Sequence, residues 1–354
     1  MPPEATEPIP GFADKDLLET VTENYGTGAD SDLPSDLRFF LNVVQLVGKR
    51  LKTVEDPSRS DPAVFFLLPN GPQLRDHLRL KSEPMLNNGV IPVAGRFWFV
   101  AQVVVKGEAL SVDDWSSDAS VFEFADKLGV GTAPAVFVDT RTNPPEARCY
   151  QSGLNKPNDV KVFPMGAAAI NIETVLSAVD RAHDQFLKTP SIQSSSLTVW
   201  RKASKHWVRE NAEKRIQDVL RIGLGSRFPA MVVRSEKPLA SGRIDLEVQE
   251  PLGQGTVVRH AVLELKVLRR FRSTGRTVPN SKNTKAIEDG VLQVSSYRKE
   301  SDAKAAALCC FDLREKYTDQ ECFVPVKRSA GARRVRLKAW HLFGSAKEFR
   351  KIFG

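Results

Sequence analysis

The sequence predicts an α/β protein in which a mixed α/β N-terminal domain precedes a separate C-terminal domain with a central mixed sheet. Short apolar runs of strand length alternate with amphipathic segments of helical period. A polar, Ser-rich stretch at residues 189–198 interrupts this pattern and is the predicted linker. The charge changes sign near it: residues 1–195 hold 18 Lys and Arg against 26 Asp and Glu, and residues 196–354 hold 33 against 17.

The first half begins with a segment of little periodicity. Residues 1–35 are rich in Pro, Gly, Asp and Glu and predict a flexible acidic arm. Residues 36–188 predict a mixed α/β domain, whose elements follow in order. They are a helix at 37–51, strands at 63–68, 90–93 and 97–105, a helix at 121–128, a strand at 133–139 and an amphipathic helix at 170–187. No catalytic motif occurs among them, so we expect this domain to sense, recognise or assemble.

The second half, residues 199–354, shows a sharper pattern. It opens with a predicted long helix at 197–224 and a short strand at 231–234. Two β-rich runs, 241–248 and 256–268, flank a turn cluster and predict a hairpin. A basic loop at 269–285, a helix at 286–300 and a buried strand at 303–313 follow, and residues 327–338 predict a late hairpin that turns at Ala330-Gly331.

Composition excludes several classes of protein. A chain of 354 residues with 41% hydrophobic and 27% charged residues is typical of a globular protein of two domains. No apolar run approaches the roughly 20 residues that a membrane helix needs, and the N-terminus lacks the pattern of a signal peptide. We therefore expect a cytoplasmic protein with no membrane partner. The four cysteines lack zinc-ligand spacing and predict buried, reduced thiols.

One strand carries an unusual pair of charges. The run Val262–Leu268 is almost wholly apolar, as in a strand buried on both faces, but it contains Glu264 and Lys266. Residues two apart on a strand share a face, and buried charges need partners or a metal. A surface ion pair on a half-exposed strand is the alternative, which the apolar neighbours disfavour. Asp245 lies on the preceding strand, where pairing can bring it to Glu264, and a divalent cation would relieve the repulsion between these carboxylates.

Two helices supply further polar side chains. Glu213 is predicted on the apolar stripe of the long helix, and Glu210, about one turn earlier, is the reserve candidate. Gln293 and Tyr297 are four apart and share a face of the following helix. Alone, Glu213 is more simply a helix-packing outlier, and the second pair is ordinary surface chemistry.

Taken in order, these residues resemble the PD-(D/E)xK nuclease superfamily, which includes many restriction and anti-phage defence enzymes. The resemblance covers roughly residues 205–313 and rests on Glu213, Gly242-Arg-Ile-Asp245, Glu264-Leu-Lys266 and Gln293-x-x-x-Tyr297. It departs from the pattern where Arg243-Ile244 stand in place of the Pro before Asp245. It implies a restriction-endonuclease-like three-layer domain with Asp245, Glu264 and Glu213 as metal ligands. It also implies Lys266 as the catalytic lysine, Glu213 as an auxiliary acid and Gln293 as a positioning residue.

The basic segment after Lys266 is the expected contact with the DNA backbone. Its cations would bind phosphates with a salt-dependent affinity. The cations of this segment are Arg269, Arg270, Arg272, Arg276, Lys282 and Lys285. Gly275 favours a mobile segment that becomes ordered on DNA, and a solvated, disordered loop that binds nothing is the alternative.

The expected function is that of a magnesium-dependent endonuclease that hydrolyses DNA phosphodiester bonds, with Mn²⁺ able to replace Mg²⁺. A bacterial restriction or anti-phage defence effector fits the resemblance. Its N-terminal domain would bind a second copy of the chain or a partner protein of the defence system. The alternatives are a non-cleaving nucleic-acid-binding protein that retains the nuclease fold, and an assembly protein whose basic half contacts an acidic partner.

Overall fold

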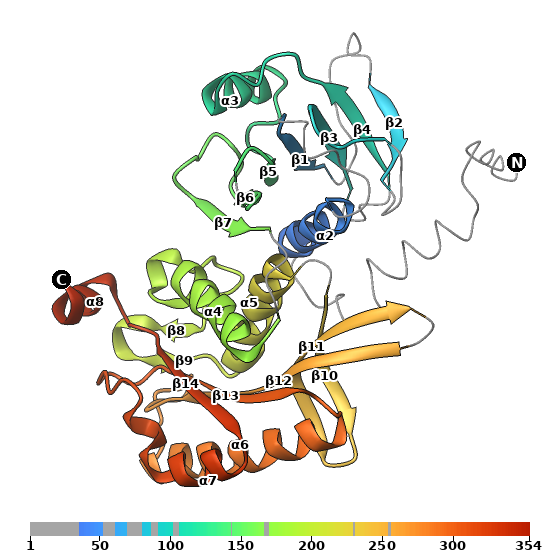
Figure 1. Ribbon diagram of the computed structural model, residues 1–354. Helices are drawn as coiled ribbons and strands as arrows, with labels where there is room; N and C mark the ends of the chain where they lie inside the picture. Colours follow the sequence, from blue (N-terminus) through green and yellow to red (C-terminus); the bar gives the residue numbers. More distant parts are fainter. Residues whose placement is uncertain are drawn as a thin grey trace, which may run out of the picture. The chain divides into compact units, whose positions relative to one another are not determined.

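The computed structural model describes residues 35–51, 61–68, 80–85, 91–101, 106–142, 144–165, 170–228, 231–253 and 256–354. The chain is an α/β protein that divides into two compact units, Met1–Gly166 and Ala167–Gly354 (Figure 1). Each unit contains a mixed sheet, of seven strands in the first and five in the second. The predicted acidic arm, except its last residue, lies outside the described residues. Across the described part of the chain, no helix has the length and apolarity needed to span a bilayer.

The first unit contains helices α2 and α3 and strands β1 to β7. Their bounds are Ser35–Arg50 for α2, Asp118–Lys127 for α3, and Ala63–Leu67, Lys81–Pro84, Arg96–Val100, Lys106–Ser111, Ala135–Asp139, Glu146–Tyr150 and Val160–Pro164 for the strands. The strand order is β2-β4-β3-β1-β5-β6-β7, with β1 parallel to β3 and the other pairs antiparallel.

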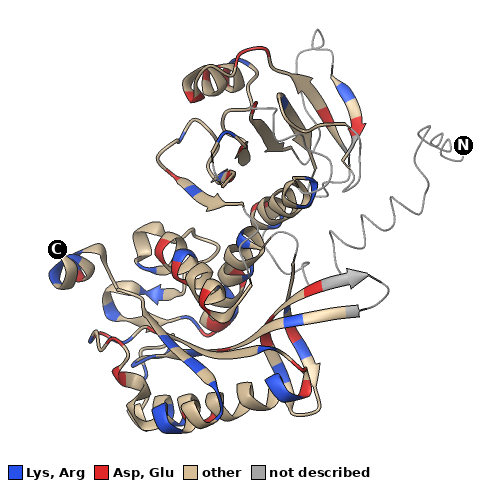
Figure 2. Cartoon of the chain, viewed as in Figure 1, with Lys and Arg blue, Asp and Glu red and all other residues tan. Residues whose placement is uncertain are grey.

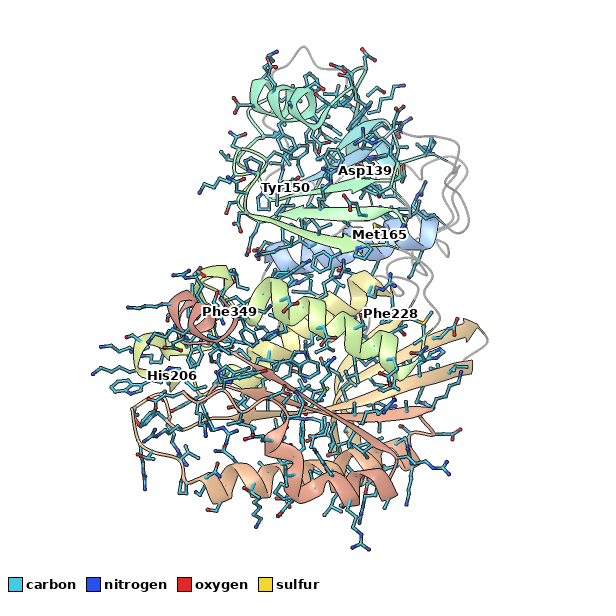
Figure 3. The ribbon with its side chains drawn as sticks, turned by 60° about the vertical axis from the view of Figure 1, so that its left-hand side comes forward. Asp139, Tyr150, Met165, His206, Phe228 and Phe349 are labelled. Carbon is cyan, nitrogen blue, oxygen red and sulfur yellow. The ribbon has the colours of Figure 1, made fainter. Side chains whose placement is uncertain are left out.

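The sequence predicted α2, β1, β3, α3 and β5 to within a few residues. It was wrong about a strand at residues 90–93, because the described residues 91–93 are not in a strand. It missed β2, β4, β6 and β7, whose runs, such as KSEP and KGEALS, contain too few apolar residues to stand out. Aromatic side chains fill the core of this unit, among them Phe66, Phe97, Trp115, Phe137 and Tyr150, the last labelled in Figure 3.

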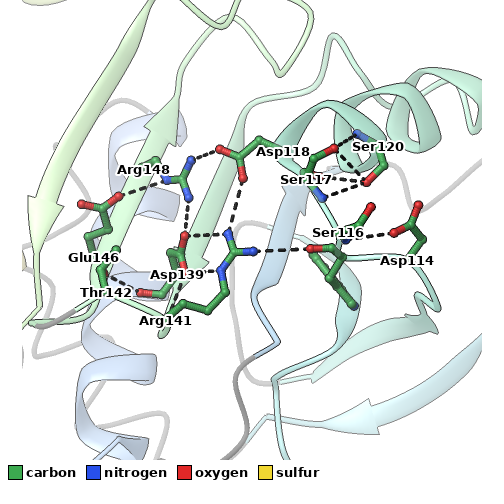
Figure 4. A network of polar contacts seen from close by, with 11 residues as sticks. Asp114, Ser116, Ser117, Asp118, Ser120, Asp139, Arg141, Thr142, Glu146 and Arg148 are labelled. Atoms are coloured by element: carbon green, nitrogen blue, oxygen red, sulfur yellow. Dashed lines mark hydrogen bonds and ion pairs between the residues drawn. The ribbon is translucent and has the colours of Figure 1, made fainter.

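A polar network joins β5, β6 and α3 (Figure 4). Asp139, buried at the end of β5, accepts hydrogen bonds from Nε and Nη2 of Arg141 at 2.9 and 2.8 Å and pairs with Arg148 at 2.5 Å. Arg148 also pairs with Asp118 at the start of α3 and lies over the ring of Phe137. Burial raises the pKa of Asp139, but hydrogen bonds and the charge of Arg141 outweigh it, and the pKa is lowered. Two arginines pair here with three acids, Asp118, Asp139 and Glu146, and we interpret the network as structural.

The second unit contains helices α4 to α8 and strands β8 to β14. The helices are α4 Ile172–Ala182, α5 Ala212–Arg227, α6 Asn280–Glu300, α7 Lys327–Ala332 and α8 Ala346–Phe353. The strands are β8 Trp200–Lys202, β9 Trp207–Val208, β10 Val232–Leu239, β11 Gly242–Gly253, β12 Thr256–Leu268, β13 Ala305–Asp312 and β14 Val335–His341. Short helical turns lie at η1 His183–Leu187, η2 Pro190–Ile192, η3 Ala203–Lys205 and η4 Glu321–Val326.

The five-stranded sheet separates two groups of helices. Its order is β10-β11-β12-β13-β14, with β10, β11 and β12 antiparallel and β12, β13 and β14 parallel. Figure 1 shows α4 and α5 on one face of this sheet and α6 and α7 on the other. The predicted buried strand is confirmed as β13, whose residues after Ala305 are all buried. A continuous core joins β12, β13 and α6 through Val262, Leu308, Val291 and Val294.

The start of the second unit differs from the prediction. The helix expected at 197–224 begins only at Ala212, because β8 and β9 form a small hairpin before it and His206 has a left-handed backbone, with φ 52°. The last predicted helix of the first half is α4, which packs against α5 where Gly223 leaves room for Ala182. The second unit therefore begins before the predicted linker at 189–198. Residues 189–198 are held to η1 by a hydrogen bond of 2.8 Å from Nε2 of Gln193 to the Leu187 carbonyl.

The predicted late hairpin at 327–338 is also wrong. Residues 327–332 form α7, and Val335 begins β14, which pairs parallel with β13. Ala330 lies inside α7 and is buried in the core shared with α6. Burial of this helical turn outweighs the turn preference of Ala330-Gly331.

Candidate active site

Glu264 and Lys266 lie on one face of β12, toward α6. The flanking residues of that face, Val262 and Leu268, belong to the core that α6 covers. Glu264 is only 3% exposed, whereas Lys266 is half-buried, and its Nζ donates to Oε1 of Glu264. Gly290 of α6 lies against Lys266, since a Cβ there would be 3.3 Å from Cε of the lysine. The predicted buried charge pair on a central strand is present.

Asp245 reaches the same place from β11. Its Oδ2 accepts a hydrogen bond of 2.7 Å from the backbone N–H of Leu265, the residue between Glu264 and Lys266. Regular pairing of β11 with β12 begins at the next residue, Leu246, opposite Leu263. Gln217 of α5, itself buried, donates from Nε2 to the Asp245 carbonyl at 2.8 Å. The Asp245 carboxylate thus lies against the Glu264-Leu-Lys266 segment, as strand pairing predicted.

Tyr297 of α6 supports the start of β11. Its hydroxyl accepts a hydrogen bond of 3.2 Å from the backbone N–H of Arg243. Gly242 has φ +140°, and a Cβ there would lie 2.6 Å from the Tyr297 hydroxyl oxygen. Only glycine fits this close approach without strain. The glycine three residues before Asp245 therefore has a steric cause in this structure.

Glu213 lies in the first turn of α5 with its side chain exposed, so its predicted place on the buried stripe is wrong. The later start of the helix explains this, because Glu213 now lies at the helix end and the continuously buried residues of α5 begin only at Ile216. Partial desolvation and then the negative charge of Asp245 raise the pKa of Glu213, and Lys266 opposes this. Glu213 therefore borders the acids from the rim of the site.

Burial and neighbouring charges raise the pKa of the acids. Burial and then the charge of Asp245 raise the pKa of Glu264 to about 7, although Lys266 lowers it. Burial also raises the pKa of Asp245. Burial alone would lower the pKa of Lys266, but Glu264, Asp245 and Glu213 outweigh it and the pKa is raised. Two carboxylates beside one ammonium, with Glu213 at the rim, leave an excess of negative charge in a poorly solvated place.

The donor set fits a divalent cation in part. Oε2 of Glu264 is buried and has no hydrogen-bond partner among the described residues. Its neighbour Asp245 offers a second carboxylate, and oxygen ligands of this kind suit Mg²⁺. Over the described ranges, however, no three Asp, Glu, His or Cys side chains are gathered as a complete metal site. Asp245 and Glu264 are the ligands that the arrangement favours, with Glu213 farther out.

Gln293 does not join this cluster. It lies one turn from both Gly290 and Tyr297, but its side chain is exposed and, within the described part of the chain, makes no hydrogen bond to the acids. Tyr297 is the residue of this pair that faces the acids: burial and then the charge of Glu264, with a smaller effect of Asp245, raise the pKa of its hydroxyl. The four-residue spacing of Gln293 and Tyr297 was a signal for this helix face, but it did not distinguish the two.

The predicted basic loop is shorter than expected and has a defined shape. It spans residues 269–279, because α6 begins at Asn280. Phe271 bridges to both Trp207 and Thr277, and the Gly275 N–H donates to the Arg272 carbonyl at 3.0 Å. Gly275 has φ +83° and lies against the Trp207 ring. This glycine closes a tight turn, which does not fit the prediction of a segment that is ordered only on DNA.

The predicted phosphate-binding cations lie on two elements. Arg269, Arg270, Arg272 and Arg276 are in the loop, whereas Lys282 and Lys285 are exposed on the first turns of α6. Arg270 pairs with Glu315 at 2.9 Å, and the charge of Arg269 opposes the rise in the pKa of Glu213. The loop is fastened near α5 by Ser273, whose hydroxyl donates to Glu210 at 3.0 Å. The reserve acid Glu210 thus holds the loop and does not border Glu264.

Comparisons with known proteins leave the family open. No protein-family model, no curated protein and no solved structure matches the chain.

Proposed function

We propose that the second unit is a divalent-metal-dependent nuclease that hydrolyses phosphodiester bonds of DNA. We further propose that its helix–sheet–helix arrangement is a restriction-endonuclease-like three-layer fold. In support, the sheet bears Asp245 on β11 and Glu264 and Lys266 on β12, between α5 and α6. A role as a restriction or anti-phage defence effector follows from the resemblance of the motif order alone.

One observation carries the proposal: the carboxylate of Asp245 is held against the strand segment that bears Glu264 and Lys266, in a place where burial raises the pKa of Glu264 to about 7. This arrangement lowers the stability of the metal-free protein, because Oε2 of Glu264 is buried without a hydrogen-bond partner among the described residues. Groups with perturbed pKa values cluster at functional sites more often than in structural cores.

The residues suggest a division of labour. Asp245 and Glu264 would hold Mg²⁺, which supplies a more acidic bound water and charge stabilisation when present. Lys266 would place its ammonium beside the scissile phosphate and stabilise charge that develops on its oxygens. Glu213 at the rim would accept or return a proton, because its raised pKa lies closer to neutrality. The cations of the loop and of α6 would bind flanking phosphates.

Plasmid cleavage tests the proposal. Wild-type protein with supercoiled DNA and Mg²⁺ should yield nicked or linear DNA, and EDTA should stop the reaction. Asp245→Asn removes a ligand charge with little change in shape and should lower the rate at least about 100-fold. Asp289→Asn, an exposed aspartate on α6, is the matched control and should cut at the wild-type rate. Supercoiled DNA that persists with Mg²⁺ and with Mn²⁺ would argue against the enzyme.

A non-cleaving nucleic-acid-binding protein is the second candidate. Two observations favour it: Lys266 is paired directly with Glu264, and no complete three-ligand cluster is gathered in the described residues. In that case the protein should bind DNA equally well in EDTA and in Mg²⁺ without EDTA. Asp245→Asn should bind DNA more tightly than wild type, because it removes a negative charge near phosphate. Cleavage by the wild type excludes this candidate.

A further inference from the structure

One cavity of the C-terminal unit lies away from Asp245 and Glu264. This aromatic pocket, of about 320 Å³, is at the carboxyl end of β14. Its rings come from η1, the loop after β13, the end of β14 and the residues that follow through α8; they are His183, Tyr317, Trp340, His341, Phe343, Phe349 and Phe353. Ligands of open α/β sheets commonly bind outside the carboxyl ends of parallel strands, and β13 and β14 are parallel. Asp245, Glu264 and Lys266 are not among the residues that line it.

The rings form a connected cluster with an open side. Phe353 meets Tyr317 and Phe349 with ring centroids 5.3 Å apart in both cases, and Phe343 lies 5.4 Å from Phe349, which Figure 3 labels. Phe353 is nevertheless 55% exposed, and α8 has no buried residue. A large ring held at the rim of a cavity by other rings is a surface on which a further flat ring can stack.

The wall of the pocket is also polar. Burial lowers the pKa of His341 to about 4, so near pH 7 its ring is neutral, with one N–H donor and one lone pair. Neither ring nitrogen of His341 has a hydrogen-bond partner in the described part of the chain. Asp184 and Lys188, paired at 2.5 Å, and Asp319 also line the pocket. This mixture suits a heteroaromatic ring better than a hydrocarbon chain.

Helix α8, which lines part of the aromatic pocket, also carries three cations. Lys347, Arg350 and Lys351 of α8 are exposed, and none forms an ion pair with another described residue. Figure 2 shows the blue of Lys and Arg on α8. The single acid of this helix, Glu348, is engaged elsewhere, since it accepts the Gly344 N–H at 2.9 Å. Stacking rings next to free cations are the combination by which proteins bind single-stranded nucleic acid.

We propose that the aromatic pocket binds an unpaired base of single-stranded nucleic acid, while the cations of α8 contact the neighbouring phosphates. Base stacking supplies the affinity, because every base has a flat face, and the cations supply a salt-dependent part. The proposal goes beyond the nuclease and concerns binding alone, so it holds whether or not the protein cuts.

A fluorescent base tests it on the whole chain. Single-stranded DNA with one 2-aminopurine is titrated with protein in EDTA, so that metal-dependent cleavage cannot intervene. Stacking on an aromatic ring quenches the probe, and wild-type protein should quench it. Phe353→Ala should weaken this binding at least about fivefold. Ile352→Ala, on the same helix and 46% exposed but outside the lining, is the matched control and should bind within about twofold of wild type.

Other probes separate the possible occupants. The same base within a duplex should be quenched less by the protein, and free 2-aminopurine deoxyribonucleoside monophosphate should bind more weakly than the strand. Tighter binding of the monophosphate than of the strand would overturn the proposal in favour of a nucleotide site. Equal quenching by the wild type and Phe353→Ala would also overturn it. So would binding of α8 to anionic phosphatidylserine vesicles without any response to single-stranded DNA.

Discussion

The buried carboxylate of Glu264 should lower the stability of the metal-free protein at neutral and alkaline pH. Its pKa rises from 4.5 to about 7, chiefly through burial and then through Asp245. Between pH 4.5 and about pH 7, therefore, the folded state keeps a proton on Glu264 that the unfolded state has already released. Stability contributed by this proton is present at low pH and is lost as the pH rises through about 7.

The size of the effect follows from the shift. A change of about 2.5 pKa units corresponds to about 3 kcal/mol above pH 7, as an upper bound, because the acids and Lys266 titrate together. Glu264→Gln keeps the shape and removes the charge. We expect this variant to be more stable than wild type at pH 8 in EDTA by about 1–3 kcal/mol, with little difference at pH 5. For a unit of this size, that is about 2–12 °C in Tm.

Thermal unfolding followed by circular dichroism at several pH values between 5 and 8 checks this, with Glu288→Gln on the exposed face of α6 as control. The gap between Glu264→Gln and wild type should widen as pH rises, whereas Glu288→Gln should follow wild type throughout. Mg²⁺ should then narrow the gap by stabilising wild type alone. A gap that is constant with pH, or a variant less stable than wild type at pH 8, would refute the reasoning.

Three further outcomes are expected. Lys266→Ala should lose plasmid cleavage by at least about 100-fold while it retains its circular dichroism spectrum; cleavage at the wild-type rate would mean that the site is misplaced. Gly242→Ala should cost about 2–3 kcal/mol, because its Cβ would lie 2.6 Å from the Tyr297 hydroxyl at a φ of +140°. Tyr297→Phe in the same chain should recover part of that loss, and strict additivity of the two changes in thermal unfolding would contradict the steric cause. Three loop arginines, Arg269, Arg270 and Arg272, can be replaced together by Gln. This change should lower the slope of log Kd against log salt for duplex DNA by about 2–3. An unchanged slope would show that the loop does not contact phosphates.

The central strands could be predicted because their signals are local. An apolar run interrupted only by Glu264 and Lys266 allows few structures other than a buried strand, and β12 and β13 lie where periodicity placed them. The meeting of Asp245 with this strand followed from hairpin pairing. These features depend on residue type and on the two-residue period of a strand.

The rest depended on contacts between distant segments. The start of α5 is set by the pairing of Trp200 with Val208, which no helical periodicity reveals. That later start moves Glu213 from the buried stripe to the rim. The choice of Tyr297 over Gln293 depends on how α6 is rotated against β11, which the spacing of the two residues leaves open. The aromatic pocket gathers residues from 183 to 353 and had no sequence signal at all.

The location of a bound ion is the most direct measurement of the central claim. Crystals of the protein soaked with Mn²⁺ would give an anomalous signal at the ion's position. The account predicts a peak between the carboxylates of Asp245 and Glu264, and none there in crystals of Glu264→Gln. Well-ordered carboxylates with no peak between them at millimolar Mn²⁺ would contradict it.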